Sequence, residues 1–232
     1  MMRTLSACAA GAALLLTGCT ATVSGRALPA DTDGPLPPPT VAVGGLDTLL
    51  PKAFELDGII GATGMEVKDR VTDMFDDTAE VSEPACLDVW LPIEAPAYDG
   101  SGWSAMRAQQ LADGTPETLT HYVVQAVVAF PTADGARQFF DAATQTWAQC
   151  AEQPFGYTRP GKPTSTWTHG ALTTTEDTLA MPQTREAGGG WSCQRARSVH
   201  SNVIADALVC GFAIDDQAAT LVAHVAENMP KA

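Results

Sequence analysis

The chain has 232 residues, of which 27 are Asp or Glu and 13 are Lys or Arg, so its formal net charge at pH 7 is −14. A chain this acidic is repelled by phosphate backbones, which argues against nucleic acid as a partner. Its length allows one domain with a sizeable core, which we expect over residues 45–232.

The first 18 residues have the layout of a secretory signal peptide, with Arg3 followed by an apolar run over residues 9–16. That run is too short to span a bilayer, which takes about 20 apolar residues. The tetrapeptide 16–19 (Leu-Thr-Gly-Cys) resembles a bacterial lipobox, whose cysteine carries lipid once the preceding peptide is removed. We therefore expect an extracytoplasmic protein, anchored to the cell membrane by lipid on Cys19. The alternative is an ordinary signal peptide with an incidental cysteine.

Residues 19–44 are expected to form an extended, lipid-anchored stalk. Thr, Ser, Gly and Ala dominate this segment, and residues 35–39 read Pro-Leu-Pro-Pro-Pro. Such a composition buries too little apolar surface to offset the entropy lost on ordering. The stalk is expected to lift the folded domain off the membrane.

The remaining pattern predicts the α+β class, with a mostly antiparallel sheet and helices packed on it. Strands are expected at residues 66–74, 103–111, 121–130, 191–199 and 204–212, and helices at 51–62, 132–150 and from Asp215, which can cap the last one. The last helix is expected to bury Ala218, Leu221, Val222 and Val225.

Residues 158–184 are rich in Thr and hold two prolines, so we expect a mobile loop or irregular edge strands there. The alternative is a regular strand at the Thr-Trp-Thr alternation of residues 166–168.

The helix at 132–150 has a clear start and one apolar face. Thr132 is a suitable N-cap residue. At helical spacing, one stripe then holds Ala136, Phe139, Phe140, Ala143, Trp147 and Cys150. Cys150 is therefore expected on the buried face at the helix end.

The strands at 191–199 and 204–212 are expected to form a hairpin. If Val199 faces Ile204, the register makes four further pairs: Arg197–Asp206, Arg195–Leu208, Cys193–Cys210 and Trp191–Phe212. One register thus places an ion pair, two cysteines and two aromatic rings opposite one another. Directly opposed cysteines are close enough to bridge.

Four cysteines remain after the signal peptide and the lipidated residue are set aside, and an even number outside the cytoplasm argues for two disulfides. Counting alone permits three pairings. The hairpin register selects Cys193–Cys210, which leaves Cys86–Cys150. Because no C-x-x-C spacing or closely spaced histidines occur, we expect no zinc site.

Five blocks carry a family resemblance: residues 85–87 (ACL), 92–96 (PIEAP), 100–103 (GSGW), 125–131 (QAVVAFP) and 191–196 (WSCQRA). Over residues 46–230 the chain resembles the extracellular sensor domain of the mycobacterial receptor kinase PknH, and similar domains occur on many mycobacterial lipoproteins. The resemblance implies a mixed α/β domain with two disulfides and a ligand-binding cleft. It does not name the ligand.

We expect no catalysis, no cofactor and no metal. The Gly-Ser-Gly-Trp-Ser stretch at 100–104 lacks the spacing of a nucleophile elbow. Each histidine has a structural explanation: His121 begins a strand, His169 and His200 lie in loops, and His224 lies on the last helix. The acids between Asp73 and Glu83 lack the pattern of a calcium loop and are expected to form a solvated edge.

The candidate ligand-binding residues are Trp191, Arg195 and Arg197 on one hairpin face, with Trp103 and Arg107 on another strand. The opposite hairpin face is made of small and polar residues: Ser192, Gln194, Ala196, Ser198, Ala205 and Ala207. A helix packed there would turn the arginines toward a groove or solvent, where they suit an anionic or sugar-like ligand. The alternative is an exposed Arg197–Asp206 pair beside a surface Arg195, with no ligand.

Three functions fit this sequence. The favoured one is a lipid-anchored, ligand-binding sensor domain of the cell envelope, whose ligand is a small molecule, a glycan or a lipid. A lipid or glycolipid carrier would instead need an apolar cavity. A docking module for an envelope protein would need a flat apolar patch.

Overall fold

The computed structural model describes residues 40–115 and 117–229. The expected signal peptide, Cys19 and most of the stalk therefore lie outside the described residues. Val41 already belongs to the domain, because Asn202 accepts its N–H at 2.7 Å and donates to its carbonyl at 3.1 Å. Among the described residues, no helix is both long and apolar enough to cross a membrane.

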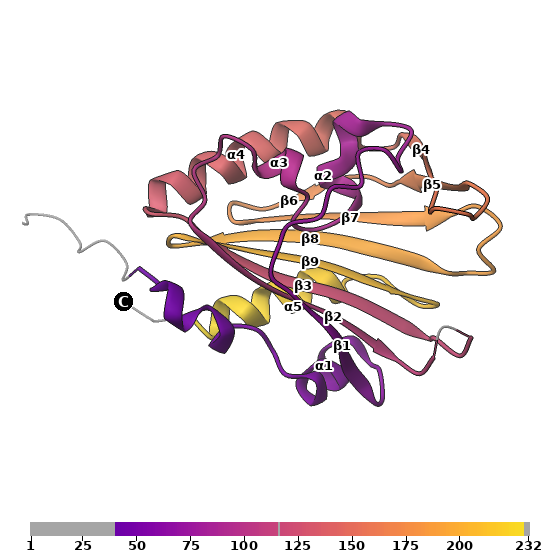
Figure 1. Ribbon diagram of the computed structural model, residues 1–232, viewed down its shortest axis with the longest axis horizontal. Helices are drawn as coiled ribbons and strands as arrows, with labels where there is room; N and C mark the ends of the chain where they lie inside the picture. Colours follow the sequence, from indigo (N-terminus) through magenta and orange to yellow (C-terminus); the bar gives the residue numbers. More distant parts are fainter. Residues whose placement is uncertain (1–39, 116, 230–232) are drawn as a thin grey trace, which may run out of the picture. The chain divides into compact units, whose positions relative to one another are not determined.

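One antiparallel sheet of nine strands organises the described residues (Figure 1). The strand order is β1-β2-β3-β9-β8-β7-β5-β4, with β6 paired to β7. The strands are β1 (Met65–Val71), β2 (Ala105–Asp113), β3 (His121–Ala129), β4 (Pro154–Tyr157), β5 (Ser165–His169), β6 (Thr173–Thr174), β7 (Thr178–Arg185), β8 (Ser192–His200) and β9 (Val203–Gly211). The predicted α+β class is confirmed.

Helices cover both faces of the sheet (Figure 1). They are η1 (Val43–Thr48), α1 (Ala53–Ile60), η2 (Pro84–Cys86), α2 (Leu87–Trp90), α3 (Ala95–Tyr98), α4 (Ala133–Cys150) and α5 (Gln217–Glu227). The elements η1, α1 and α5 pack on one face, and α4 packs on the other face together with the segment from η2 to α3. The described residues form three hydrophobic clusters: one under η1, α1 and α5, one under α4 and α3, and a third in which Leu87 and Trp90 of α2 pack with Phe155 and Trp167.

The long helix forms as its sequence predicts. Thr132 accepts the N–H of Gly135 at 3.0 Å and caps α4. All six residues of the predicted stripe are buried: Ala136, Phe139, Phe140, Ala143, Trp147 and Cys150. Both predicted disulfides, Cys86–Cys150 and Cys193–Cys210, are present.

The β8–β9 hairpin has the predicted register, with Val199 opposite Ile204 and Arg197 opposite Asp206. At its open end, the rings of Trp191 and Phe212 meet edge to face with centroids 5.2 Å apart. Small side chains on one face let α5 pack closely, as expected: Ala196, Ala205, Ala207 and Ala218 share a core.

The start of α5 differs from the prediction. The helix begins at Gln217, and the side chain of neither Asp215 nor Asp216 caps it. Instead, Oε1 of Gln194 on β8 accepts the N–H groups of Ala218 and Ala219 at 2.8 and 3.2 Å. A tertiary contact thus satisfies the free amides of the first turn, so no local capping residue is needed.

Over residues 158–184 we expected a loop or irregular edge strands, and the structure instead has the regular strands β5 and β7 with the short β6 between them. The alternative of a strand at 166–168 is confirmed. Alternate side chains of β5 face the core, where Trp167 lies 5.2 Å from Trp90 between ring centroids. His169 also lies on this strand, 1% exposed, rather than in a loop. Burial of these two rings outweighs the loop signals of the surrounding Thr and Pro.

Candidate functional site

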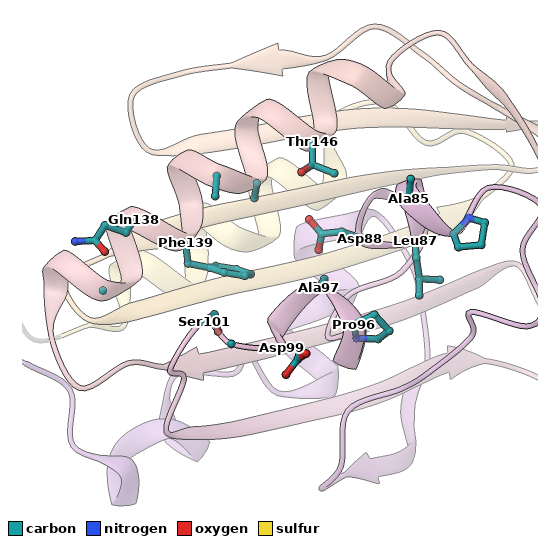
Figure 2. A pocket seen from close by; sticks show the side chains of 15 residues that line it. Ala85, Leu87, Asp88, Pro96, Ala97, Asp99, Ser101, Gln138, Phe139 and Thr146 are labelled. Atoms are coloured by element: carbon teal, nitrogen blue, oxygen red, sulfur yellow. The ribbon is translucent and has the colours of Figure 1, made fainter.

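A cleft separates α4 from the segment that runs from η2 past α3 (Figure 2). Its volume is about 590 Å³. It is lined by Pro84, Ala85, Leu87, Asp88, Pro96, Ala97, Asp99, Gly100, Ser101, Gly135, Gln138, Phe139, Ala142, Ala143 and Thr146. In Figure 2, Phe139 from α4 and Asp88 from α2 extend into the space between the two walls.

Helical spacing sets the α4 wall. Gln138, Ala142 and Thr146 are four residues apart, so they lie on one side of the helix beside its buried stripe. The opposite wall is joined to α4 by the Cys86–Cys150 disulfide, which links the start of α2 to the helix end. The two walls are therefore held together covalently at one end of the cleft.

The other end of the cleft is a turn around Ser101. Gly100 and Gly102 on either side have φ angles of 69° and 77°, which a residue with a side chain rarely adopts. The hydroxyl of Ser101 is buried and has no hydrogen-bond partner among the described residues. A buried hydroxyl without a partner is costly, so a hydrogen bond from a water molecule or a ligand at this end of the cleft would stabilise it.

A buried ionic network lies beneath the cleft. Arg197 is fully buried and binds Asp88 with both terminal nitrogens, at 2.6 and 2.8 Å. It also donates to Oδ2 of Asp206 at 2.9 Å. Arg195, likewise fully buried, donates to Oδ1 of Asp206 at 2.7 Å. Two cations thus face two carboxylates, and the formal charges cancel.

Further contacts fix this network to the cleft walls. Nε1 of Trp147 on α4 donates to Asp88 at 2.8 Å, and Tyr98 of α3 donates to Asp206 at 3.2 Å. The guanidinium of Arg197 lies 5.0 Å from the ring centroid of Phe139, which lines the cleft. Residues of both cleft walls therefore contact the same cluster of charged side chains.

The titration of these groups follows from burial and from their partners. Burial alone would raise the pKa of Asp206, but the adjacent Arg195 and Arg197 guanidiniums hold it below its usual value. Burial would lower the pKa of Arg197, whereas Asp206 and Asp88 raise it well above its usual value. Arg197 and Asp206 consequently stay ionised at neutral pH.

The structure brings only two of the five candidate residues to the cleft region. Arg195 and Arg197 lie beneath it, yet their terminal nitrogens bind protein groups, so the expectation that they face a groove or solvent was wrong. The exposed Arg197–Asp206 pair was also wrong, since both residues are at most 1% exposed. The physical reason is the segment 84–98, which covers β8 and supplies Asp88.

The other three candidates lie elsewhere. Trp191 packs against Phe212 at the start of β8. Trp103 precedes β2, which begins two residues later than predicted, and is 38% exposed. Arg107 lies on the β2 face toward η1, where it pairs with Asp47 at 3.2 Å. None of these three lines the cleft.

Sequence reasoning missed Asp88 and the α4 residues of the cleft. A usable signal for Asp88 is its position inside the apolar run Leu87-Asp88-Val89-Trp90, since a buried acid requires a partner. The stripe of Gln138, Ala142 and Thr146 is a weaker signal, because it resembles any solvated helix face.

Glu94 is a second buried acid in the segment between α2 and α3. It is 0% exposed, and its Oε2 accepts the N–H of Asp77 at 3.0 Å. Burial raises the pKa of Glu94 to about 8, and burial together with nearby acids raises the pKa of Asp77 to about 6. Across the described residues, no group of three His, Cys, Asp or Glu side chains is arranged to hold a metal ion.

The family model of the PknH-like extracellular domain matches residues 41–230. The chain belongs to the PknH-like extracellular domain family. It is 34% identical over 196 residues to the serine/threonine-protein kinases PknH of Mycobacterium bovis and Mycobacterium tuberculosis. That alignment covers 84% of this chain but only 32% and 31% of the two kinases, so the chain spans about a third of their length.

The fold also matches a solved member of this family. The crystal structure of the extracellular domain of PknH from Mycobacterium tuberculosis superposes with a TM-score of 0.78 at 33% identity, over 82% of this chain and 96% of that chain. The PknH-like match covers the extracellular part of the kinase and not its kinase domain. This family supports an extracytoplasmic location.

The buried network makes a specific prediction for stability. Arg197→Met should lower the free energy of unfolding by about 3–5 kcal/mol, because it leaves Asp88 and Asp206 with less compensation in the interior. Arg107→Gln is the matched control, since its pair with Asp47 is partly exposed and worth at most about 1 kcal/mol. Urea denaturation measures both, and a loss below about 1 kcal/mol for Arg197→Met would contradict the network's role.

Glu94 makes a prediction for pH dependence. Its carboxyl has a pKa near 4.5 in the unfolded chain and about 8 in the folded chain. The contribution of the buried neutral carboxyl to the free energy of unfolding is therefore complete below pH 4.5 and is lost as pH rises to 8. Asp77 lowers stability in the same way only up to its folded pKa of about 6. Of these two carboxyls, Glu94 therefore causes most of the loss of stability above pH 6.

Glu94→Gln keeps an acceptor for the Asp77 N–H and cannot ionise. Stability measured by urea denaturation from pH 6.5 to 8.5 should therefore fall less steeply in Glu94→Gln than in the wild type. The exposed Glu83→Gln is the control and should keep the wild-type slope. Equal slopes in Glu94→Gln and wild type would show that Glu94 is already ionised at pH 6.5.

Proposed function

We propose that this PknH-like domain binds a ligand in the cleft between α4 and the α2–α3 segment, without catalysis, as a lipid-anchored sensor of the cell envelope. The observation that carries the proposal is the open cleft with the unpartnered Ser101 hydroxyl at one end. The buried network and the Cys86–Cys150 disulfide support it, because they hold both walls in place before a ligand arrives.

The cleft lining indicates the chemical class of the ligand. Asp88 and Asp99 are its two charged residues, and no Lys or Arg lines it. An anion would therefore find no free cation beside the exposed Asp99, because Arg195 and Arg197 are bound to Asp88 and Asp206. Hydroxyl and amide groups beside the Phe139 ring suit an uncharged or cationic sugar, through hydrogen bonds and ring stacking.

The mixed polar lining favours a sensor over an acyl-lipid carrier, which needs an apolar cavity. The identified relatives are receptor kinases, whereas this match covers their extracellular part alone. We infer that binding at this domain acts through an envelope partner or by capture of the ligand itself. The anchor on Cys19 would keep the domain at the membrane surface.

The lipid anchor is tested by Cys19→Ala. We expect the wild type to partition into the detergent phase and the variant into the aqueous fraction, because the acyl chains are lost. Phase separation followed by mass determination of the N-terminal peptide provides the measurement. A variant that still partitions with membranes would show that another segment anchors the protein.

Ligand binding is tested by blocking the cleft. Ala142 is exposed on the cleft side of α4, so Ala142→Trp fills the cleft without altering the core, and Ala148→Trp on the same helix is the matched control away from it. Saturation-transfer NMR with glucose, glucosamine and glucuronate measures binding. Glucose and glucosamine should give signals that Ala142→Trp removes and Ala148→Trp keeps, whereas glucuronate should give none.

Two outcomes would contradict this proposal. If none of the three sugars gives a signal, the cleft does not bind this class of ligand. If mass spectrometry of the purified wild type finds retained acyl lipid that Ala142→Trp loses, the carrier function replaces the sensor function.

A further inference from the structure

A second hollow lies between the β4–β5 turn and the end of β7. It has a volume of about 410 Å³. Arg159, Lys162 and Arg185 line it, together with Thr166 and Glu186. It has no lining residue in common with the cleft, whose walls come from residues 84–101 and 135–146.

The distribution of cations makes this hollow unusual for such an acidic chain. The described residues include ten Lys and Arg, and five of them form ion pairs: Lys68, Arg107, Arg137, Arg195 and Arg197. The five with no ion pair among the described residues are Lys52, Arg70, Arg159, Lys162 and Arg185. Three of these five converge on the hollow, where Glu186 is the acid among the lining residues, so the lining carries a net charge of +2.

Hydrogen bonds hold the backbone of the residues that carry these cations. The N–H of Lys162 donates to the carbonyl of Arg159 at 3.0 Å across Pro160-Gly161, and Gly161 has a φ of 72°. Proline and glycine at the two central positions are typical of a tight β-turn. Arg159 and Lys162 therefore flank a stiff turn, and little backbone entropy is lost when they bind a ligand together.

The third cation is held by neighbouring strands. The N–H of Glu186 donates to the backbone carbonyl of Thr166 at 2.9 Å. The N–H of Gly188 donates to the backbone carbonyl of Arg185 at 3.3 Å. Arg185 is thereby fixed at the end of β7, beside the β4–β5 turn. The hydroxyls of Thr158 and Thr164 meet at 2.7 Å and close the base of the turn.

We propose that this hollow binds a phosphate group, carried by a lipid headgroup or by a soluble phosphorylated sugar. A phosphate monoester carries a charge of about −2 and three acceptor oxygens, which suit three separate cations. Arginine binds phosphate oxygens in pairs and lysine adds a point charge. A carboxylate has two oxygens and one charge, which a single arginine already satisfies, so it makes less use of this arrangement.

The test uses the full-length Cys19→Ala protein, so that an acyl anchor does not itself hold the protein on vesicles. One probe is glucose 6-phosphate. Its uncharged control is glucose added to the Cys19→Ala, Ala142→Trp protein, in which the cleft is blocked, so that binding of the sugar ring in the cleft does not enter the comparison. The other is phosphatidylcholine vesicles with or without phosphatidic acid. Calorimetry follows the sugar and vesicle sedimentation follows the lipid, each at low and at high salt, because exposed charges are screened by salt.

The variants compare two pairs of unpaired cations. The double variant Arg159→Gln and Lys162→Gln should weaken binding of the phosphate probe at least tenfold, whereas Lys52→Gln with Arg70→Gln, which removes the same charge elsewhere, should change it less than twofold. All four side chains are exposed, so the melting temperature should stay at the wild-type value.

The pattern of binding identifies the source of the phosphate. Binding to phosphatidic acid vesicles alone assigns the hollow to a lipid headgroup, and binding to glucose 6-phosphate assigns it to a soluble ligand. Failure of both probes, or equal losses in the two double variants, overturns the proposal. The cleft variant Ala142→Trp should leave this binding unchanged, so the result is independent of the sensor function.

Discussion

Two buried arginines on β8 join the α2–α3 segment to the sheet. Arg197 binds Asp88 with two parallel hydrogen bonds, and both arginines bind Asp206 on β9. Since the helices α2 and α3 have four residues each, they are too short to be stable by themselves. Their position therefore depends on tertiary contacts, among them the buried ion pairs and the Cys86–Cys150 disulfide.

This dependence links the interior to the cleft. Asp88 belongs to the cleft wall and to the network, and Phe139 lines the cleft while it packs over Arg197. A ligand that moves either residue thus acts directly on a cluster of buried charges. Such a cluster has few alternative arrangements, because each charge would lose its partner on moving. The buried ionic network thus lies beneath the cleft, and the Cys86–Cys150 disulfide holds the α2 wall at one end.

Charge is also divided between the two concave sites. Among the described residues, two acids and no cation line the cleft, whereas three cations without an ion pair line the hollow at the β4–β5 turn. Because the linings differ in charge, we expect the two hollows to favour different ligands. We propose a neutral or cationic sugar for the first and a phosphate group for the second.

The spacing of apolar residues along the sequence was enough to predict the helix and the hairpin that bury one face. The stripe of α4, the register of the β8–β9 hairpin and the Cys193–Cys210 pair all follow from periodicities of 3.6 and 2, which are properties of neighbouring residues. The family could also be predicted, because its cysteines and tryptophans occur in short blocks. The Thr-rich segment shows the limit, since burial of Trp167 and His169 outweighed its turn residues.

The candidate site depended on contacts that no local pattern records. Arg197 and Asp88 are 109 residues apart, and the hairpin pattern alone left Arg197 with Asp206 on an open face. Only the folded chain placed the segment 84–98 over that face, which turned an expected surface pair into a buried network. The sequence by itself determined the pairing of β8 with β9 and of Cys193 with Cys210, because both follow from local periodicity. Which polar groups are buried and which remain available to a ligand was decided by the tertiary structure, because burial depends on what the rest of the chain places above them.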